Sequence, residues 1–343
     1  MESGNRRVKA GKIRQLHIYM RENRMNPDPA SPASASPDQE PPGQKTTGQA
    51  LIISSYGNQG VVELEDGRQL SCVYRRTIGR PVCGDHVRID TGQGDSHPVD
   101  EIYPRRNTFV RGLRDGRKQV MAANLDQVVI VVAPEPAPSR DLLDRYLVAV
   151  LSLDIQAIIA VNKFELLSAK ANDRPAPFNR MDDYRALGHT VVETSCEGEP
   201  GTDTLKPLLE GKVSILVGQS GVGKSSLVNR LVPDLDLQTQ VLSRSTGKGK
   251  HTTTTTMMFR LPGTGRLIDS PGVWEYGLWD MDRAELLRGY PEFGRAKDSC
   301  RFNDCRHLKE PGCAIVSAVE AGLVPAWRLD SYRRLLVQGQ AQL

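Results

Sequence analysis

The chain contains Gly218-Gln219-Ser220-Gly221-Val222-Gly223-Lys224-Ser225, which matches the phosphate-binding pattern G-x-x-x-x-G-K-[ST] at every fixed position. An apolar, β-branched run (Val213–Val217) precedes it, and Ser226–Leu231 follows with helical apolar spacing. Strand, glycine loop and helix are the order that phosphate binding needs, because backbone N–H groups then surround the anion at a helix N-terminus. The sequence therefore predicts a nucleoside triphosphate site; a glycine-rich turn that matches by chance is the alternative.

A guanine-reading motif is predicted at Asn162-Lys163-Phe164-Glu165, directly after the apolar strand Ile155–Val161. In the GTPase motif Asn-Lys-x-Asp, the carboxylate accepts from the ring N–H and the exocyclic amine of guanine, which adenine cannot offer. Glu165 keeps the carboxylate and is one methylene longer. Thr194-Ser195-Cys196 ends a later strand and is expected to give a backbone contact to the guanine O6. The alternative is a chance surface loop, in which case the chain would be an ATPase.

A magnesium site is predicted from three oxygen ligands. Ser225 of the phosphate loop offers a hydroxyl, and Asp269 at the end of a strand offers a carboxylate. The run Thr252–Thr256 offers a further hydroxyl, which we assign to Thr253, and its glycine- and lysine-rich lead-in favours a switch that senses the γ-phosphate. Gly272 is expected to donate its N–H to that phosphate. The alternative for the threonine run is a plain β segment.

These motifs occur in a rotated order, because the guanine reader and the second base contact precede the phosphate loop, the switch and the metal aspartate. Such a rotation of the motif order leaves the core contacts intact. Domain termini lie close together at the surface, so they can be joined and the chain opened elsewhere. Strands alternate with helices, as in an α/β sheet with helices on both faces. The residues predicted to contact GTP or GDP are Asn162, Lys163, Glu165, Thr194, Ser195, Cys196, Gly218, Gln219, Ser220, Gly221, Val222, Gly223, Lys224, Ser225, Ser226 and Gly272.

The N-terminal third of the chain predicts an arm and a small barrel. Residues 1–47 begin with a basic segment and continue Pro- and Ser-rich, which predicts a disordered arm suited to RNA phosphates or, alternatively, a solvated tail. Residues 48–104 contain short strands and the hairpin signal Asp66-Gly67, which favour an oligonucleotide-binding (OB) barrel. The predicted strands are 51–56, 61–65, 70–74 and 87–90. Arginines 75, 76, 80 and 88 would give the barrel a basic face; otherwise it only packs against its neighbour.

The C-terminal part contains Cys300-x4-Cys305-x-His307-x5-Cys313. Three thiols and one imidazole fit a closed, tetrahedral structural zinc site, whereas a catalytic zinc keeps one position open. Free structural thiols are the alternative. The end of the chain, Ile315–Leu336, is predicted to be helical with a break at Pro325. The sequence thus predicts a multidomain α/β chain in which residues 105–284 form the permuted GTPase domain and residues 285–343 form a zinc-finger and helical domain.

Composition is that of an ordinary soluble protein of 343 residues with a net charge of +4. The modest charge means that only local clusters of Arg and Lys can carry an argument for nucleic-acid binding. No apolar run approaches about 18 residues, which predicts a cytoplasmic protein with no membrane contact. We also expect a monomer.

The barrel, the rotated motif order, His251 before the threonine run and the cysteine–histidine finger together closely resemble the ribosome small subunit-dependent GTPase A family. The resemblance covers about residues 48–335. It implies GTP hydrolysis stimulated by the small (30S) ribosomal subunit during late maturation, with the barrel and zinc domain contacting the subunit and its rRNA. It also implies a catalytic role for His251. Glu165, where the family has Asp, and the Pro-rich arm depart from the family pattern.

The residues themselves also favour a catalytic histidine. Val273 occupies the place where Ras-like GTPases carry a water-orienting glutamine, so another side chain must orient the water. His251 on a mobile loop is the candidate; the alternatives are an exposed loop histidine or an RNA contact. A rival function from another class is a nucleotide-controlled RNA-binding module in which hydrolysis is incidental.

Overall fold

The computed structural model describes residues 47–92, 94, 96–112, 118–139, 141–235, 238–239, 256–269 and 281–340. Three predicted site residues, His251, Thr253 and Gly272, lie outside these ranges, as does nearly all of the predicted N-terminal arm. The described residues belong to one compact unit, Lys45–Leu343. Among the helices of this described part, none is long and apolar enough to cross a membrane.

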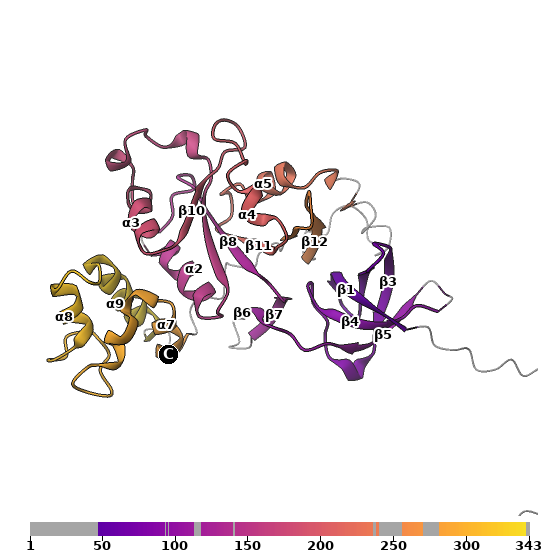
Figure 1. Cartoon of the computed structure of the whole chain (residues 1–343), viewed down its shortest axis with the longest axis horizontal. Helices are drawn as coiled ribbons and strands as arrows, with labels where there is room; N and C mark the ends of the chain where they lie inside the picture. The colour runs from indigo at the N-terminus through magenta and orange to yellow at the C-terminus, as the bar shows by residue number, and fades with distance from the viewer. Residues whose placement is uncertain are drawn as a thin grey trace, which may run out of the picture. The chain divides into compact units, whose positions relative to one another are not determined.

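The first strands close into a five-stranded barrel (Figure 1). The strand order is β1-β2-β3-β5-β4, and pairing of β4 with β1 closes the ring. Only β3 and β5 pair in parallel. Inward-facing apolar side chains such as Ile52, Val62 and Ile89 fill the interior and are fully buried. The predicted OB-type barrel is therefore confirmed. Its strands are β1 (Thr47–Tyr56), β2 (Gln59–Leu64), β3 (Gln69–Tyr74), β4 (His86–Asp90) and β5 (His97–Ile102).

The sequence did not predict strand β5, because Pro98, Asp100 and Glu101 interrupt the alternation of apolar and polar residues that is typical of a strand. Those acids neutralise part of the predicted basic face. Arg75 forms an ion pair with Asp100 at 3.1 Å, and Arg88 forms one with Glu101 at 3.0 Å. Two of the four arginines proposed for RNA contact are therefore paired within the barrel.

The central part is a mixed sheet in the order β10-β9-β8-β11-β13-β12. All its pairings are parallel except that of β12 with β13. Every residue of β8 is buried, as expected of a parallel strand covered on both faces, and helix α2 packs against β8 and β9. The strands are β8 (Gln127–Val132), β9 (Gln156–Val161), β10 (Thr190–Glu193), β11 (Val213–Val217), β12 (Thr256–Arg260) and β13 (Arg266–Asp269), and the helices are α2 (Leu142–Leu151), α3 (Met181–Ala186), α4 (Lys206–Leu209) and α5 (Lys224–Leu231).

The phosphate-loop strand β11 lies in the interior of this sheet although it comes late in the chain. Its Ser214 pairs with Gln127 of β8 on one side and with Leu267 of β13 on the other. The ends of β9, β11 and β13 consequently meet at one edge of the sheet, where parallel α/β sheets bind their ligands. The guanine motif, the phosphate loop and Asp269 follow or end these three strands.

A second element missed from the sequence links the barrel to the sheet: the hairpin of β6 (Thr108–Gly112) and β7 (Lys118–Ala123). The Ala123 N–H at the end of β7 donates to the Cys83 carbonyl of the barrel at 2.9 Å. Arg105 in the connecting chain donates two bonds of 2.7 Å to the buried Asp85. The barrel is therefore tied to the sheet by hydrogen bonds as well as by the chain.

The C-terminal part is helical (Figure 1). Its core is built from its own side chains together with Val148 of α2. Tyr290, Phe293 and Tyr332 pack with ring centroids 5.0–5.6 Å apart. Asp282 and Glu285 form a capping box at the start of α7, satisfying backbone donors there. The elements are α7 (Arg283–Arg288), the 3₁₀ segment η5 (Pro291–Asp298), α8 (Ala314–Glu320) and α9 (Ala326–Gln340).

A buried charged cluster joins α2 to the C-terminal helices. Arg328 of α9 is 0% exposed and donates to Asp144 of α2 at 2.6 Å and to Glu292. Asp144 also accepts from Ser331 and, at 2.8 Å, from Tyr184. The guanidinium carbon of Arg328 lies 4.3 Å from the ring centroid of Tyr290. Each buried charge is thus paired and hydrogen-bonded, as burial requires.

Candidate nucleotide site and metal centre

The phosphate loop has the backbone that its sequence demands. It connects β11 to α5, and glycines occupy its positive-φ positions, with φ of 149° at Gly218, 82° at Gly221 and 92° at Gly223. A Cβ on Gly218 would lie 2.2 Å from the Val131 carbonyl oxygen, so no side chain fits there. The Lys224 ammonium donates to the Gly218 and Gln219 carbonyls at 2.7 Å, which places it at the loop itself. The loop therefore has glycines where its backbone requires them and the Lys224 ammonium against its carbonyls, as a phosphate-binding loop needs.

Asn162 joins the base-reading motif to the phosphate loop. It is 1% exposed, and its amide nitrogen donates to the Val222 carbonyl of the loop at 2.8 Å. Its amide oxygen accepts from the Thr194 hydroxyl at 3.1 Å. One side chain after β9 therefore binds both the loop after β11 and the segment after β10.

The remaining residues of the guanine motif are more open. Lys163 has a left-handed backbone (φ 55°), and its ammonium donates to the Glu135 carbonyl at 2.8 Å. Glu165 is exposed in the 3₁₀ turn η2 (Phe164–Leu166). A Cβ on Gly198 would lie 3.6 Å from that of Glu165, so the carboxylate side chain stands beside the loop after β10. It is accessible to a base.

The loop Thr194–Cys196 is braced from several sides. The Thr194 and Ser195 N–H groups donate to Val161 and Gly201, and the Ser195 hydroxyl accepts from the Gly198 N–H at 2.7 Å. The Cys196 carbonyl accepts from Arg230 of α5 at 2.8 Å. Of the three backbone N–H groups in this described loop, that of Cys196 is the one left available to face a base. Burial raises the pKa of the Cys196 thiol, which keeps it neutral.

Asp269 lies near the phosphate loop through sheet register. It ends β13, whose Ile268 pairs with Ile215 of β11 immediately before the loop. Ser225 and Ser226 are exposed at the start of α5. The structure thus gathers every predicted nucleotide and magnesium residue that it describes at one edge of the sheet.

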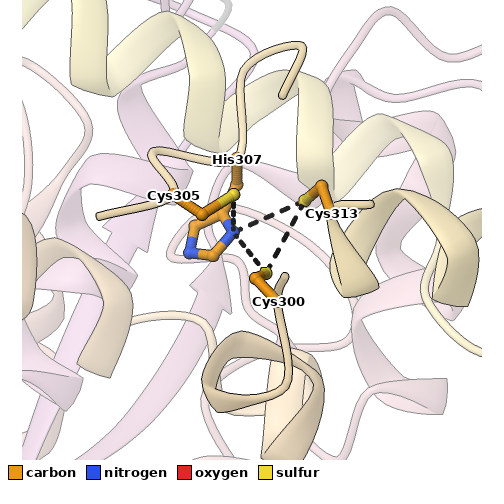
Figure 2. A group of neighbouring side chains, drawn as sticks. All are labelled: Cys300, Cys305, His307 and Cys313. Carbon is orange, nitrogen blue, oxygen red and sulfur yellow. Dashed lines mark hydrogen bonds between the residues drawn. The ribbon is translucent and has the colours of Figure 1, made fainter. Parts of the chain in front are cut away.

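The cysteine–histidine finger forms a tight cluster (Figure 2). The His307 Nδ1 lies 3.5 Å from the sulfurs of Cys300 and Cys313 and 3.6 Å from that of Cys305. The Cys300 and Cys313 sulfurs are 4.0 Å apart. All four ligand atoms lie within 4.8 Å of one another.

These distances fit a tetrahedral zinc site. With Zn–S of about 2.3 Å and Zn–N of about 2.0–2.1 Å, a tetrahedron separates N from S by about 3.6 Å and S from S by about 3.8 Å. The Ala314 N–H points at the Cys300 sulfur at 3.3 Å, which suits a thiolate. A disulfide needs about 2.05 Å between sulfurs, so the cluster is not a disulfide pair. The donor set therefore fits zinc.

Comparison with known proteins places the chain in a family. The model of the RsgA GTPase family matches residues 102–279. The chain is 41% identical over 298 residues to the Small ribosomal subunit biogenesis GTPase RsgA of Hahella chejuensis, covering 86% of this chain and 85% of that protein. A protein of the same name from Actinobacillus succinogenes is 40% identical over 291 residues, covering 83% of each. The chain belongs to the RsgA GTPase family.

Solved structures agree with this RsgA-family assignment. YjeQ from Thermotoga maritima matches with a TM-score of 0.67 and 27% identity, covering 86% of this chain and 99% of that one. YloQ, described as a circularly permuted GTPase, matches with the same TM-score and identity and covers 89% of this chain. The rotated motif order is therefore a circular permutation, and the RsgA-family chain is a GTP hydrolase that acts in ribosome biogenesis.

Two contacts in this RsgA-family site had no sequence signal. Glu135 holds Lys163 through its carbonyl, and Arg230 holds the base loop through a guanidinium. A backbone carbonyl carries no residue preference, and the contact from Arg230 to Cys196 spans 34 positions. The sequence of α5 alone could not distinguish Arg230 from a solvated arginine.

Proposed function

We propose that this RsgA-family GTPase binds the small ribosomal subunit and hydrolyses GTP during late maturation of that subunit, with turnover stimulated by the subunit. The observation that carries the nucleotide part is the Asn162 side chain, which joins the base-reading motif to the phosphate loop. The name printed for its relatives, Small ribosomal subunit biogenesis GTPase RsgA, supports the choice of partner.

In this proposal the nucleotide lies along the carboxyl edge of the sheet. Glu165 accepts from guanine, and the Cys196 N–H donates to the guanine O6. The loop amides from Gly218 to Lys224 surround the β-phosphate, and the Lys224 ammonium exchanges its carbonyl partners for β- and γ-phosphate oxygens.

Magnesium accompanies GTP in the proposed site, held by Ser225, Asp269 and Thr253. Hard carboxylate and hydroxyl oxygens are the ligands that Mg²⁺ prefers. When bound, the ion neutralises charge on the β- and γ-phosphates. Gly272 donates its N–H to the γ-phosphate, and His251 orients the attacking water once the subunit orders the switch.

Docking is assigned to the zinc domain and the barrel. The finger residues Cys300, Cys305, His307 and Cys313 hold one structural zinc. Between the first two of them, Phe302 is 43% exposed, and the Arg301 guanidinium lies 5.5 Å from its ring centroid. An exposed aromatic ring beside a cation suits stacking on an unpaired RNA base. In the barrel, Arg76 and Arg80 are exposed and suit phosphate contacts.

The test compares GTP and ATP turnover by the full chain with and without purified small subunits. We expect slow GTP hydrolysis alone, a large acceleration by small subunits and little activity on ATP. Absence of both acceleration and co-sedimentation with small subunits would overturn the proposed partner. Nucleotide-dependent docking without acceleration would favour an RNA-binding module in which hydrolysis is incidental.

A further inference from the structure

The hairpin of β12 and β13 joins the two segments that would sense the γ-phosphate. Thr256, the last residue of the threonine run, begins β12, and Asp269 ends β13. Met257 and Asp269 are register partners, so Thr256 and Asp269 lie at the same end of the hairpin. Contacts that fix the hairpin therefore also fix Asp269.

The barrel holds this hairpin at its open end. β12 pairs with β1 through Ser54–Met257 and Ser55–Thr256. The Cys83 thiol of the barrel donates to the Thr256 carbonyl at 3.2 Å. The strand that follows the switch is therefore part of both the barrel edge and the GTPase sheet.

The barrel also holds the hairpin at its closed end, through one buried carboxylate. Glu63 of β2 is 5% exposed. One of its oxygens accepts from Arg260 at 2.8 Å and 2.7 Å, and the other accepts from Arg266. Arg260 and Arg266 are cross-strand partners on the hairpin, and Arg260 also donates to the Gly67 carbonyl at 3.1 Å. Without the carboxylate, two adjacent guanidinium groups would repel each other.

We propose that Glu63 is a positioning residue for the magnesium site: a barrel carboxylate that, through Arg260 and Arg266, fixes the β12–β13 hairpin and hence Asp269. This inference rests on the metal role proposed above for Asp269. Arg266 and Asp269 are three residues apart on one strand, about 10 Å. The pairings of β12 with β1 and of β13 with β11 still hold the open end, so release at the turn is expected to shift Asp269 slightly and not to free it.

The physical consequence is a coupling between barrel and nucleotide. The Glu63 carboxylate belongs to the barrel and also orders the hairpin. RNA that distorts the barrel near β2 would therefore alter Mg²⁺ binding. Binding of Mg²⁺–GTP would in turn alter the barrel. Such coupling is reciprocal by thermodynamic linkage. Glu63 touches neither nucleotide nor metal in this scheme.

The experiment measures how strongly Mg²⁺ tightens binding of a fluorescent, non-hydrolysable GTP analogue to the full-length protein. Glu63→Gln keeps the size of the side chain and removes its charge. We expect the tightening by Mg²⁺ to fall at least fivefold, while affinity without Mg²⁺ stays within twofold of wild type. Glu65→Gln, an exposed carboxylate just beyond the same strand, is the matched control and should behave as wild type.

Two further variants decide the interpretation. Asp269→Asn should abolish most of the Mg²⁺ effect; if it does and Glu63→Gln does not reduce the effect, the positioning role is overturned while the metal assignment stands. If Asp269→Asn also leaves the effect intact, both are overturned. The triple variant Glu63→Gln/Arg260→Gln/Arg266→Gln leaves no unpaired charge at this position. It should show the same reduced tightening by Mg²⁺, so the reduction cannot be attributed to misfolding caused by two unpaired arginines in the single variant. The readout needs no hydrolysis, so it is independent of subunit stimulation.

Discussion

A single amide group, that of Asn162, connects the base side and the phosphate side of the nucleotide site. Its nitrogen can donate to Val222 and its oxygen can accept from Thr194, but the reversed orientation would lose both bonds. The side chain is buried, so water cannot replace the lost partners. The two halves of the site are consequently pre-organised before a nucleotide arrives, which lowers the entropy cost of binding.

Base selection is expected to depend on the Glu165 carboxylate. GTP should bind about 10²-fold or more tightly than ATP, because adenine would leave the carboxylate without its donors. Glu165→Asp should hold or improve GTP affinity, since the shorter side chain is the one for which the motif is known. Glu165→Ala should reduce the GTP-to-ATP preference at least tenfold. Competition binding with both nucleotides measures this, and equal affinity of wild type for ATP and GTP would contradict the assignment.

Hydrolysis is expected to depend on His251. His251→Ala should lose most of the acceleration by small subunits, which in GTPases can reach about 10³ or more, while GTP affinity stays nearly unchanged. The reason is that the side chain acts on the attacking water and not on the bound nucleotide. Single-turnover hydrolysis with saturating small subunits measures it, with Lys224→Ala as the comparison that weakens binding itself. Full stimulation of the His251→Ala protein would shift the role to a threonine of the run or to the ribosome.

At the scale of elements, helices α2 and α9 are locked together by a charged cluster. Asp144 of α2 accepts from three groups, and Arg328 of α9 bridges two carboxylates. The neighbouring ring of His189 has its pKa lowered to about 4, first by burial and then by Arg328. This histidine stays neutral, so it adds no second positive charge near the guanidinium.

Removing Arg328 should loosen the C-terminal helices from α2. Arg328→Ala leaves Asp144 and Glu292 buried without their cation, which typically costs about 3–5 kcal/mol. Lys206→Ala removes a solvent-exposed pair with Asp203, 2.7 Å long, and should destabilise the protein far less, because exposed ion pairs contribute little. Urea unfolding followed by tryptophan fluorescence compares the two, since Trp327 packs on Tyr184 at 5.1 Å between ring centroids. Equal destabilisation by both variants would contradict the dominance of the buried cluster.

The elements that the sequence predicted are those with a strong local pattern. β9 and β11 carry continuous apolar residues, and the structure has them within one residue of the expected bounds, 155–161 and 213–217. β5 and the β6–β7 hairpin lack such a pattern, because their stability comes from partners distant in the chain. The Arg328 cluster was also not predicted, since its contacts span 36 to 187 positions and no spacing rule encodes them. In the candidate site, the motifs predicted which residues belong to it. They did not predict the contacts of Asn162 with Val222, of Glu135 with Lys163 or of Arg230 with Cys196, which only the structure shows.

At the scale of the whole molecule, metal removal should separate nucleotide binding from docking. The zinc cluster belongs to the core of the C-terminal part, whereas the phosphate loop belongs to that of the sheet. Cys305→Ala should abolish one tightly bound zinc per chain and unfold the C-terminal module, because structural zinc contributes directly to folding. Affinity for GTP should stay within a few-fold of wild type, and binding to small subunits should be lost. Metal analysis, nucleotide titration and subunit co-sedimentation check the three parts.

Cys72→Ala is the control, since that buried barrel thiol is remote in sequence from the finger. It should keep zinc and subunit binding. Wild-type protein purified without chelators and free of zinc would contradict the metal assignment. Intact docking by Cys305→Ala would remove the zinc domain from the interface while leaving the metal site unchallenged.

The interior position of β11 also sets the order in which the protein can fold during its synthesis. Of the strands in the GTPase sheet, β8, β9 and β10 leave the translating ribosome first, and β8 then has no neighbour on one side until β11 emerges about eighty residues later. During that interval a strand that is Val and Ile at every position after Gln127 has one edge open to wrong pairing, the situation in which nascent chains aggregate or recruit chaperones. Insertion of β11 closes this edge and completes the phosphate loop in the same step. Nucleotide that binds the completed loop would stabilise the native pairing of β11 over wrong pairings of β8, because a ligand that binds only the folded state stabilises it.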